Sequence, residues 1–103
     1  MSESEIVDYI NNQYDEKVME IKTGYNQNNM LLETMFSGDI LNAKKKLLEK
    51  SVNTIIEHLV IVKMSLLKQS KSFEKMIEIL PNRKDLIISQ IKARLDIPTN
   101  FTY

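Results

Sequence analysis

The stretch from Asp39 to Leu80 runs for 42 residues without a glycine or a proline. Because these are the residues that most often interrupt a helix, the stretch favours one continuous helix. At roughly 1.5 Å per residue such a helix would be about 60 Å long. Its apolar residues recur in alternating steps of three and four, which places them on one face. The sequence therefore predicts a long central helix, about 39–80, packed along most of its length.

We call the packed face of this helix the seam. Its members, in heptad order, are Leu48, Val52, Ile55, Leu59, Val62, Leu66, Gln69, Phe73 and Met76. The polar member, Gln69, is expected to set register or oligomeric state at some cost in stability. Apolar residues also lie off the seam, including Ile61 and Met64. A two-stranded coil would leave them in water, so a three- or four-helix bundle is predicted, within one chain or between chains.

Two local patterns in this stretch have alternative interpretations. The segment 54–62 is rich in β-branched residues and could form a buried strand, but the helical repeat continues on both sides without a turn residue, which favours helix. Polar residues also recur every seven positions beside the seam. These residues are Ser51, His58, Ser65 and Ser72. They either allow a neighbouring helix to approach closely or form a half-exposed polar border, and the border is the preferred interpretation.

The flanking segments predict three further helices. A first helix over 3–23 is expected to stop at Gly24, followed by a polar connection and a short helix over 29–36. Pro81 should end the long helix, because proline lacks the amide donor. A last helix over 83–96, capped by Asn82, precedes a tail, 97–103, whose two aromatic residues either dock in a groove of a neighbour or fray. The fold class is all-α, in a single domain spanning 1–103.

Composition excludes several classes of protein. The chain has no cysteine, which removes disulfide frameworks and thiolate sites. The N-terminus is acidic where an export signal needs a basic start, and the longest apolar run, 59–62, is far below the ~20 residues that span a bilayer. We expect a soluble cytoplasmic protein that has no membrane contact.

The net charge is zero, but it is unevenly distributed. Residues 1–39 carry eight acids and two lysines, giving −6, whereas residues 40–103 carry twelve bases and six acids, giving +6. Opposite charges of this size favour attraction between the two halves, within one chain or head to tail between chains. The alternative is two solvated faces that never meet.

No pattern for catalysis or cofactor binding is found. His58, the single histidine, follows Glu57, and adjacent helical residues point about 100° apart, so they do not form a general-base pair. Ser65 and Lys68, like Ser89 and Lys92, match the spacing of serine–lysine enzymes without the companion motifs. We predict a protein that is not an enzyme, with no catalytic residues, cofactor, metal or small-molecule ligand.

Lysines give the main alternative function. They occur as a cluster at the start of the long helix and as a stripe further along it, and both could contact nucleic acid or an acidic partner: Lys44, Lys45, Lys46, Lys68, Lys71 and Lys75. Arginine, which is common in nucleic-acid-binding surfaces, is sparse, at two residues. Nucleic-acid binding is therefore the less favoured interpretation.

Residues 36–47, Phe-Ser-Gly-Asp-Ile-Leu-Asn-Ala-Lys-Lys-Lys-Leu, resemble a short module of tailed-phage prohead core proteins, the internal scaffold. In that family a hydrophobic pair, a Gly/Asn-Asp turn and an Ala-Lys/Arg helix start precede a long helix. The resemblance covers twelve of 103 residues and implies a viral assembly protein.

Together these observations predict a non-enzymatic assembly or adaptor protein that acts through helix packing, most simply as a homo-oligomer. The alternatives are a small regulatory protein that binds a host or cellular protein, and the nucleic-acid-binding protein described above.

Overall fold

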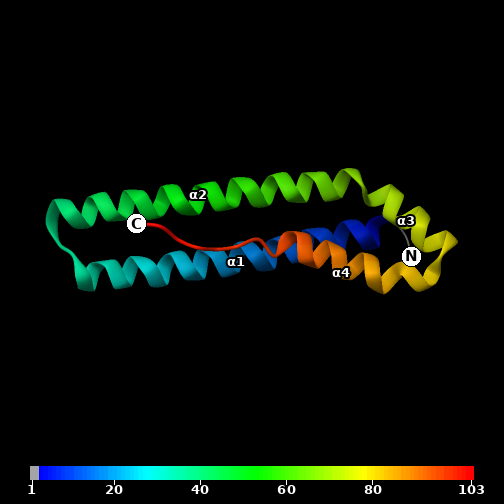
Figure 1. The fold of residues 1–103 in the computed structure, drawn as a ribbon, viewed down its shortest axis with the longest axis horizontal. Coiled ribbons are helices and arrows are strands. Elements are labelled where there is room, and N and C mark those ends of the chain that lie inside the picture. Colours follow the sequence, from blue (N-terminus) through cyan, green and yellow to red (C-terminus); the bar gives the residue numbers. More distant parts are fainter. Residues whose placement is uncertain (1–2) are drawn as a thin grey trace.

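The computed structural model describes residues 3–103 and is all-α, as predicted. Its elements are α1 (Glu3–Met35), α2 (Gly38–Lys68), α3 (Ser70–Ile79), a 3-10 turn η1 (Pro81–Arg83) and α4 (Lys84–Leu95). They form a slender bundle of 61 × 18 × 17 Å. In Figure 1, α1 and α2 form a long antiparallel hairpin, α3 bends away at the far end, and α4 returns alongside α1. Within the described part of the chain, no helix has the length and apolar character that crossing a bilayer requires.

The prediction of two separate N-terminal helices, 3–23 and 29–36, is wrong, because α1 runs without interruption from Glu3 to Met35. A glycine ends a helix by adopting a positive φ, and Gly24 does not do so. The polar segment after it stays helical, and the Asn28 side chain donates a hydrogen bond to the Gly24 carbonyl oxygen at 2.8 Å. Packing of Ile21 and Leu32, both fully buried, holds this part of α1 against the core.

The chain reverses direction between α1 and α2 at Gly38, whose φ is +61°. This left-handed conformation is accessible to glycine at little cost. Ser37 occupies the N-cap position of α2, although its side chain makes no capping hydrogen bond. Segment 54–62 is helical, so the strand alternative is excluded.

The predicted long helix, 39–80, is interrupted at Gln69. The Ser70 hydroxyl donates a hydrogen bond to the Leu67 carbonyl oxygen at 2.8 Å, an interaction that competes with the helical ladder and bends helices. The expected position of Gln69 within the packed seam is also wrong, because its side chain is exposed. It instead accepts a hydrogen bond from Arg94 of α4 at 3.2 Å.

Several buried positions of the two long helices are eleven residues apart, although Val52, Leu59 and Leu66 in α2 keep the heptad spacing of seven. Ile10, Ile21 and Leu32 have the eleven-residue spacing in α1, as do Leu48 and Leu59 in α2. Eleven residues in three turns correspond to 3.67 per turn, close to the 3.6 of a straight helix, whereas a heptad needs 3.5. The predicted heptad series stays on the buried face as far as Leu66 and leaves it after the interruption at Gln69.

At the C-terminal end the prediction is largely confirmed. Pro81 follows α3 and opens η1, and α4 occupies 84–95 where a helix over 83–96 was expected. The proposed cap is wrong: Asn82 lies within η1, and Arg83 precedes α4 without a side-chain capping hydrogen bond. On α4, Ile87, Ile91 and Leu95 face the core as predicted.

Candidate functional site

The C-terminal tail docks on its own chain. After α4 it runs in extended form between α1 and α2 towards the hairpin turn (Figure 1). Ile97 is buried, and Phe101 and Tyr103 are partly buried against the hydrophobic core. We call the surface of α1 and α2 that holds residues 97–103 the tail groove. The tail therefore neither frays nor lies in a neighbour's groove, the two predicted outcomes, but docks within its own chain.

Gly24 forms the seat for the Phe101 ring. A Cβ added at Gly24 would lie 2.5 Å from Cε2 and 2.9 Å from Cζ of Phe101, well inside van der Waals contact. Since Gly24 has no positive φ, its role is to provide space rather than an unusual backbone conformation. Glycine inside a helix costs roughly 0.5–1 kcal/mol relative to alanine. At this position the cost is offset by close packing of an aromatic ring.

Two serines beside the seam contact the returning chain. The Thr102 amide donates a hydrogen bond to the Ser51 hydroxyl at 3.1 Å. The Arg94 guanidinium donates to the Ser65 hydroxyl at 3.2 Å. Half of the predicted polar border thus serves the close approach of α4 and the tail, while His58 and Ser72 are exposed.

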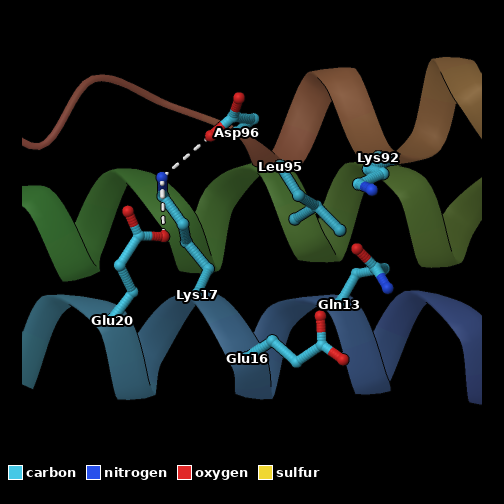
Figure 2. Close-up of a pocket in the computed structure, with 7 residues that line it drawn as sticks. All are labelled: Gln13, Glu16, Lys17, Glu20, Lys92, Leu95 and Asp96. Atoms are coloured by element: carbon cyan, nitrogen blue, oxygen red, sulfur yellow. Dashed lines mark hydrogen bonds and ion pairs between the residues drawn. The ribbon is translucent and has the colours of Figure 1, made fainter.

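The junction between α4 and the tail is fixed by a buried lysine (Figure 2). Lys17 lies on the core-facing side of α1 with its side chain only 8% exposed. Its ammonium nitrogen donates to Asp96 Oδ1 at 2.9 Å and lies 3.3 Å from Glu20 Oε2. Burying an ammonium group is costly unless carboxylates compensate it. Glu20 compensates the charge from within α1, and the Lys17–Asp96 pair holds the end of α4 against α1.

The pKa of Lys17 is raised above the ordinary lysine value of 10.5. Burial, the largest single effect, lowers it, but hydrogen bonds and Coulombic attraction from Asp96 and Glu20 together outweigh burial. A lysine that stays protonated is neither a nucleophile nor a general base. The surrounding cleft, about 190 Å³ and lined also by Gln13, Glu16, Lys92 and Leu95, is therefore best understood as an ionic anchor.

The structure places most of the predicted seam in the core of the hairpin. Leu48, Val52, Leu59 and Leu66 are buried, and Ile55, Val62 and Phe73 are half-buried against the same core. Beyond Leu66 the prediction is displaced by one residue. Ser70 and Ile77 are buried in place of Gln69 and Met76, which are exposed. The displacement begins where the helix is interrupted at Gln69, between α2 and α3.

The six candidate lysines fall into two groups. Lys44 and Lys45 are engaged within the chain: the Lys44 ammonium lies 5.5 Å from the Phe36 ring centroid, and Lys45 pairs with Glu33 at 2.7 Å. The other four are exposed: Lys46, Lys68, Lys71 and Lys75. The last three continue along one side of the molecule across the α2–α3 junction, because their spacing is three and four residues.

The acidic half of the sequence forms α1, which lies beside α2 and α4 of the basic half (Figure 1). The Lys45–Glu33 pair joins them near the hairpin turn, and the Lys63 ammonium lies 4.2 Å from the Tyr14 ring centroid further along. Of the alternatives for the charge asymmetry, attraction within one chain fits this arrangement.

Most of the exposed large apolar side chains lie in three groups. We call Val60, Ile61 and Met64 the α2 patch, because their spacing of three and four residues places them together on the helix surface. A second group lies at the α3–α4 turn, where Met76, Leu80 and Leu86 line a depression of about 400 Å³ with Arg83 at its edge. A third lies beside the hairpin turn: Met30, Leu31, Met35 and Ile40.

Sequence reasoning missed the pairs Lys17–Asp96 and Gly24–Phe101. A lysine at a core-facing position and a glycine inside a helix-compatible segment were the signals that could have indicated them. Comparisons with protein-family models, with curated proteins and with solved structures found no match.

Proposed function

We propose that this protein is a non-enzymatic assembly or adaptor protein of the cytoplasm that acts by packing its exposed helix faces against other helices, with further copies of itself as the main partner. The observation that carries the proposal is the number of exposed apolar groups. Among the described residues thirteen large apolar side chains are exposed, as many as form the buried apolar core. Single exposed apolar side chains are common, but contiguous groups of them mark interaction surfaces.

The shape of the molecule supports a large contact. A face of 61 × 18 Å offers roughly 1,100 Å², and a stable interface needs about 800 Å² from each partner. Because the seam is buried inside the hairpin, contact between copies would use the outer surface of α2. The α2 patch lies there, with Ile61 69% exposed.

The test is the mass in solution, measured by light scattering after size exclusion across a concentration series. We expect oligomers whose population falls in the double variant Ile61→Gln, Met64→Gln. The matched control is Met19→Gln, which removes an exposed methionine of α1 outside the three groups. A chain that stays monomeric at all concentrations, or a control that dissociates the oligomer equally, would contradict the proposal.

The resemblance of residues 36–47 to phage prohead core proteins supports the same functional class, and a viral assembly role is the form of the proposal that it favours. If the protein is monomeric, the regulatory alternative takes its place, with the same exposed surfaces binding a host or cellular protein.

The exposed lysines favour nucleic acid as a second candidate. Lys68, Lys71 and Lys75 present three cations in a row, and phosphate contacts of this kind weaken steeply with salt. Binding of duplex DNA that falls by about tenfold or more between 50 and 200 mM salt would support it. Replacing the three lysines by glutamate should abolish that binding and leave self-association intact.

A further inference from the structure

The tail differs from every other part of the described structure in how it is held. The helices bury their apolar faces in one another, so none can leave the bundle without exposing the core. Residues 97–103 carry no regular secondary structure. They are held by apolar side chains, chiefly Ile97 and Phe101, and by the hydrogen bond from the Thr102 amide to Ser51.

We propose that the tail groove also binds the tail of a second copy, so that two copies exchange residues 97–103. This inference rests on the proposed self-assembly and names the segment through which copies join. Exchange keeps all the contacts of the docked tail, because the groove meets the same residues from either chain. Gly24, whose missing side chain makes room for the Phe101 ring, would receive the partner's ring in the same way.

The sequence around the start of the tail suits an arm that can leave its own groove. Pro98 cannot continue a helix and keeps the residue before it, Ile97, extended. The Lys17–Asp96 ion pair lies before this point, so it can keep the end of α4 anchored while the tail swings out. Seven extended residues reach about 23 Å, which is enough to cross from one rod to an adjacent one.

Competition from the chain's own tail sets the concentration at which exchange should be visible. A short tether gives the chain's own tail an effective concentration in the millimolar range. Exchange should therefore be rare in dilute solution and rise with protein concentration or with clustering of the rods. Contact through the α2 patch would lower the concentration that is needed.

Cross-linking tests the proposal in the full chain, which has no cysteine of its own. The Thr102 amide lies 3.1 Å from the Ser51 hydroxyl, which places these two positions within reach of a disulfide. One chain carries Ser51→Cys and the other carries Thr102→Cys, and they are mixed and oxidised at about 1 mM, comparable to the effective concentration of a short tether. We expect a disulfide-linked pair of the two different chains, and less of it on dilution. Adding Phe101→Asp to the Thr102→Cys chain should remove it.

A second variant, with both cysteines in one chain, shows what the absence of a cross-link between chains would mean. Ser51→Cys and Thr102→Cys in one chain should close a disulfide within that chain. If this disulfide forms and the mixed chains give no more product than the Phe101→Asp control, the tail docks only in its own chain and exchange is refuted. Self-association by light scattering would then still support the proposed function. If the disulfide does not close, the groove does not hold the tail and exchange is refuted as well.

Discussion

Replacing Gly24 by alanine separates two opposing effects that the structure places at one position. Alanine is the better helix former and should stabilise α1 by roughly 0.5–1 kcal/mol. Its Cβ, however, would lie 2.5 Å from the Phe101 ring and must displace it. Full burial of a phenylalanine side chain contributes about 1.5–3 kcal/mol, so losing the partly buried Phe101 should cost roughly 1 kcal/mol.

These two effects nearly cancel, so the single variant should unfold at almost the same urea concentration as the parent protein. The informative comparison is a double-mutant cycle with Phe101→Ala. Without the ring, Gly24→Ala should give the whole helix-propensity gain, and the two sites should couple by about 1 kcal/mol. The matched control is Phe73→Ala, which removes another partly buried phenylalanine packed on the same core. In that background the effect of Gly24→Ala should be unchanged.

The cycle is measured by urea unfolding followed by circular dichroism, with hydrogen exchange of the Thr102 amide as a local probe of the tail. That amide donates to Ser51, so Gly24→Ala should accelerate its exchange even where global stability is unchanged. The reasoning is refuted if Gly24→Ala stabilises the parent protein by the full propensity gain and Thr102 stays protected. Additive effects of Gly24→Ala and Phe101→Ala would refute it equally.

Three further predictions follow from the core and its charges. Ile77→Ala should lower the free energy of unfolding by about 2–4 kcal/mol, whereas Met76→Ala should change it by under about 0.5 kcal/mol. Urea unfolding measures both values. If the heptad continued through α3, Met76→Ala would be the more destabilising variant. Lys17→Met should leave global stability unchanged or raise it by about 1 kcal/mol, because it removes a buried charge. The same variant should loosen Asp96 and so accelerate hydrogen exchange of the Thr102 amide. Unchanged exchange would count against the anchoring role of Lys17. The pKa of Lys17 is raised, and that of Tyr9 is raised by burial and then by Glu16. The stability that each group contributes is therefore complete below its ordinary pKa, 10.5 for Lys17 and 10.0 for Tyr9, and is lost as the pH rises through the raised value. Thermal unfolding should therefore show a loss of stability above pH 10 that is smaller in Lys17→Met.

The sequence predicted the helical class and most of the seam because both depend on local spacing. Leu48, Val52, Leu59 and Leu66 are buried as expected, since a step of three or four residues identifies a helix face over a few turns. The prediction failed beyond the interruption at Gln69, where the buried face shifts by one residue. By Met76 the heptad series had moved one residue away from the buried position, Ile77.

The tail and its anchor could not be predicted, because their partners are remote in sequence. Glycine is a residue type that often ends helices, but the actual role of Gly24 depends on Phe101, 77 positions later. Lysine is a residue type that usually lies in solvent, but Lys17 is buried because it forms an ion pair with Asp96, 79 positions away. Local propensity describes neither pair, since each exists only once the hairpin and α4 bring the helices together.

The eleven-residue spacing makes the length of this rod an adjustable quantity. A unit of eleven residues restores the same side of a nearly straight helix and adds about 16 Å. One unit inserted into α1 after Leu32 and a matching unit into α2 before Leu48 would lengthen the hairpin beyond the tail groove, leaving Gly24, Ser51 and the whole far end unchanged. The distance between the hairpin turn and the α3–α4 turn could thus change in fixed steps, while the surfaces at both ends are preserved.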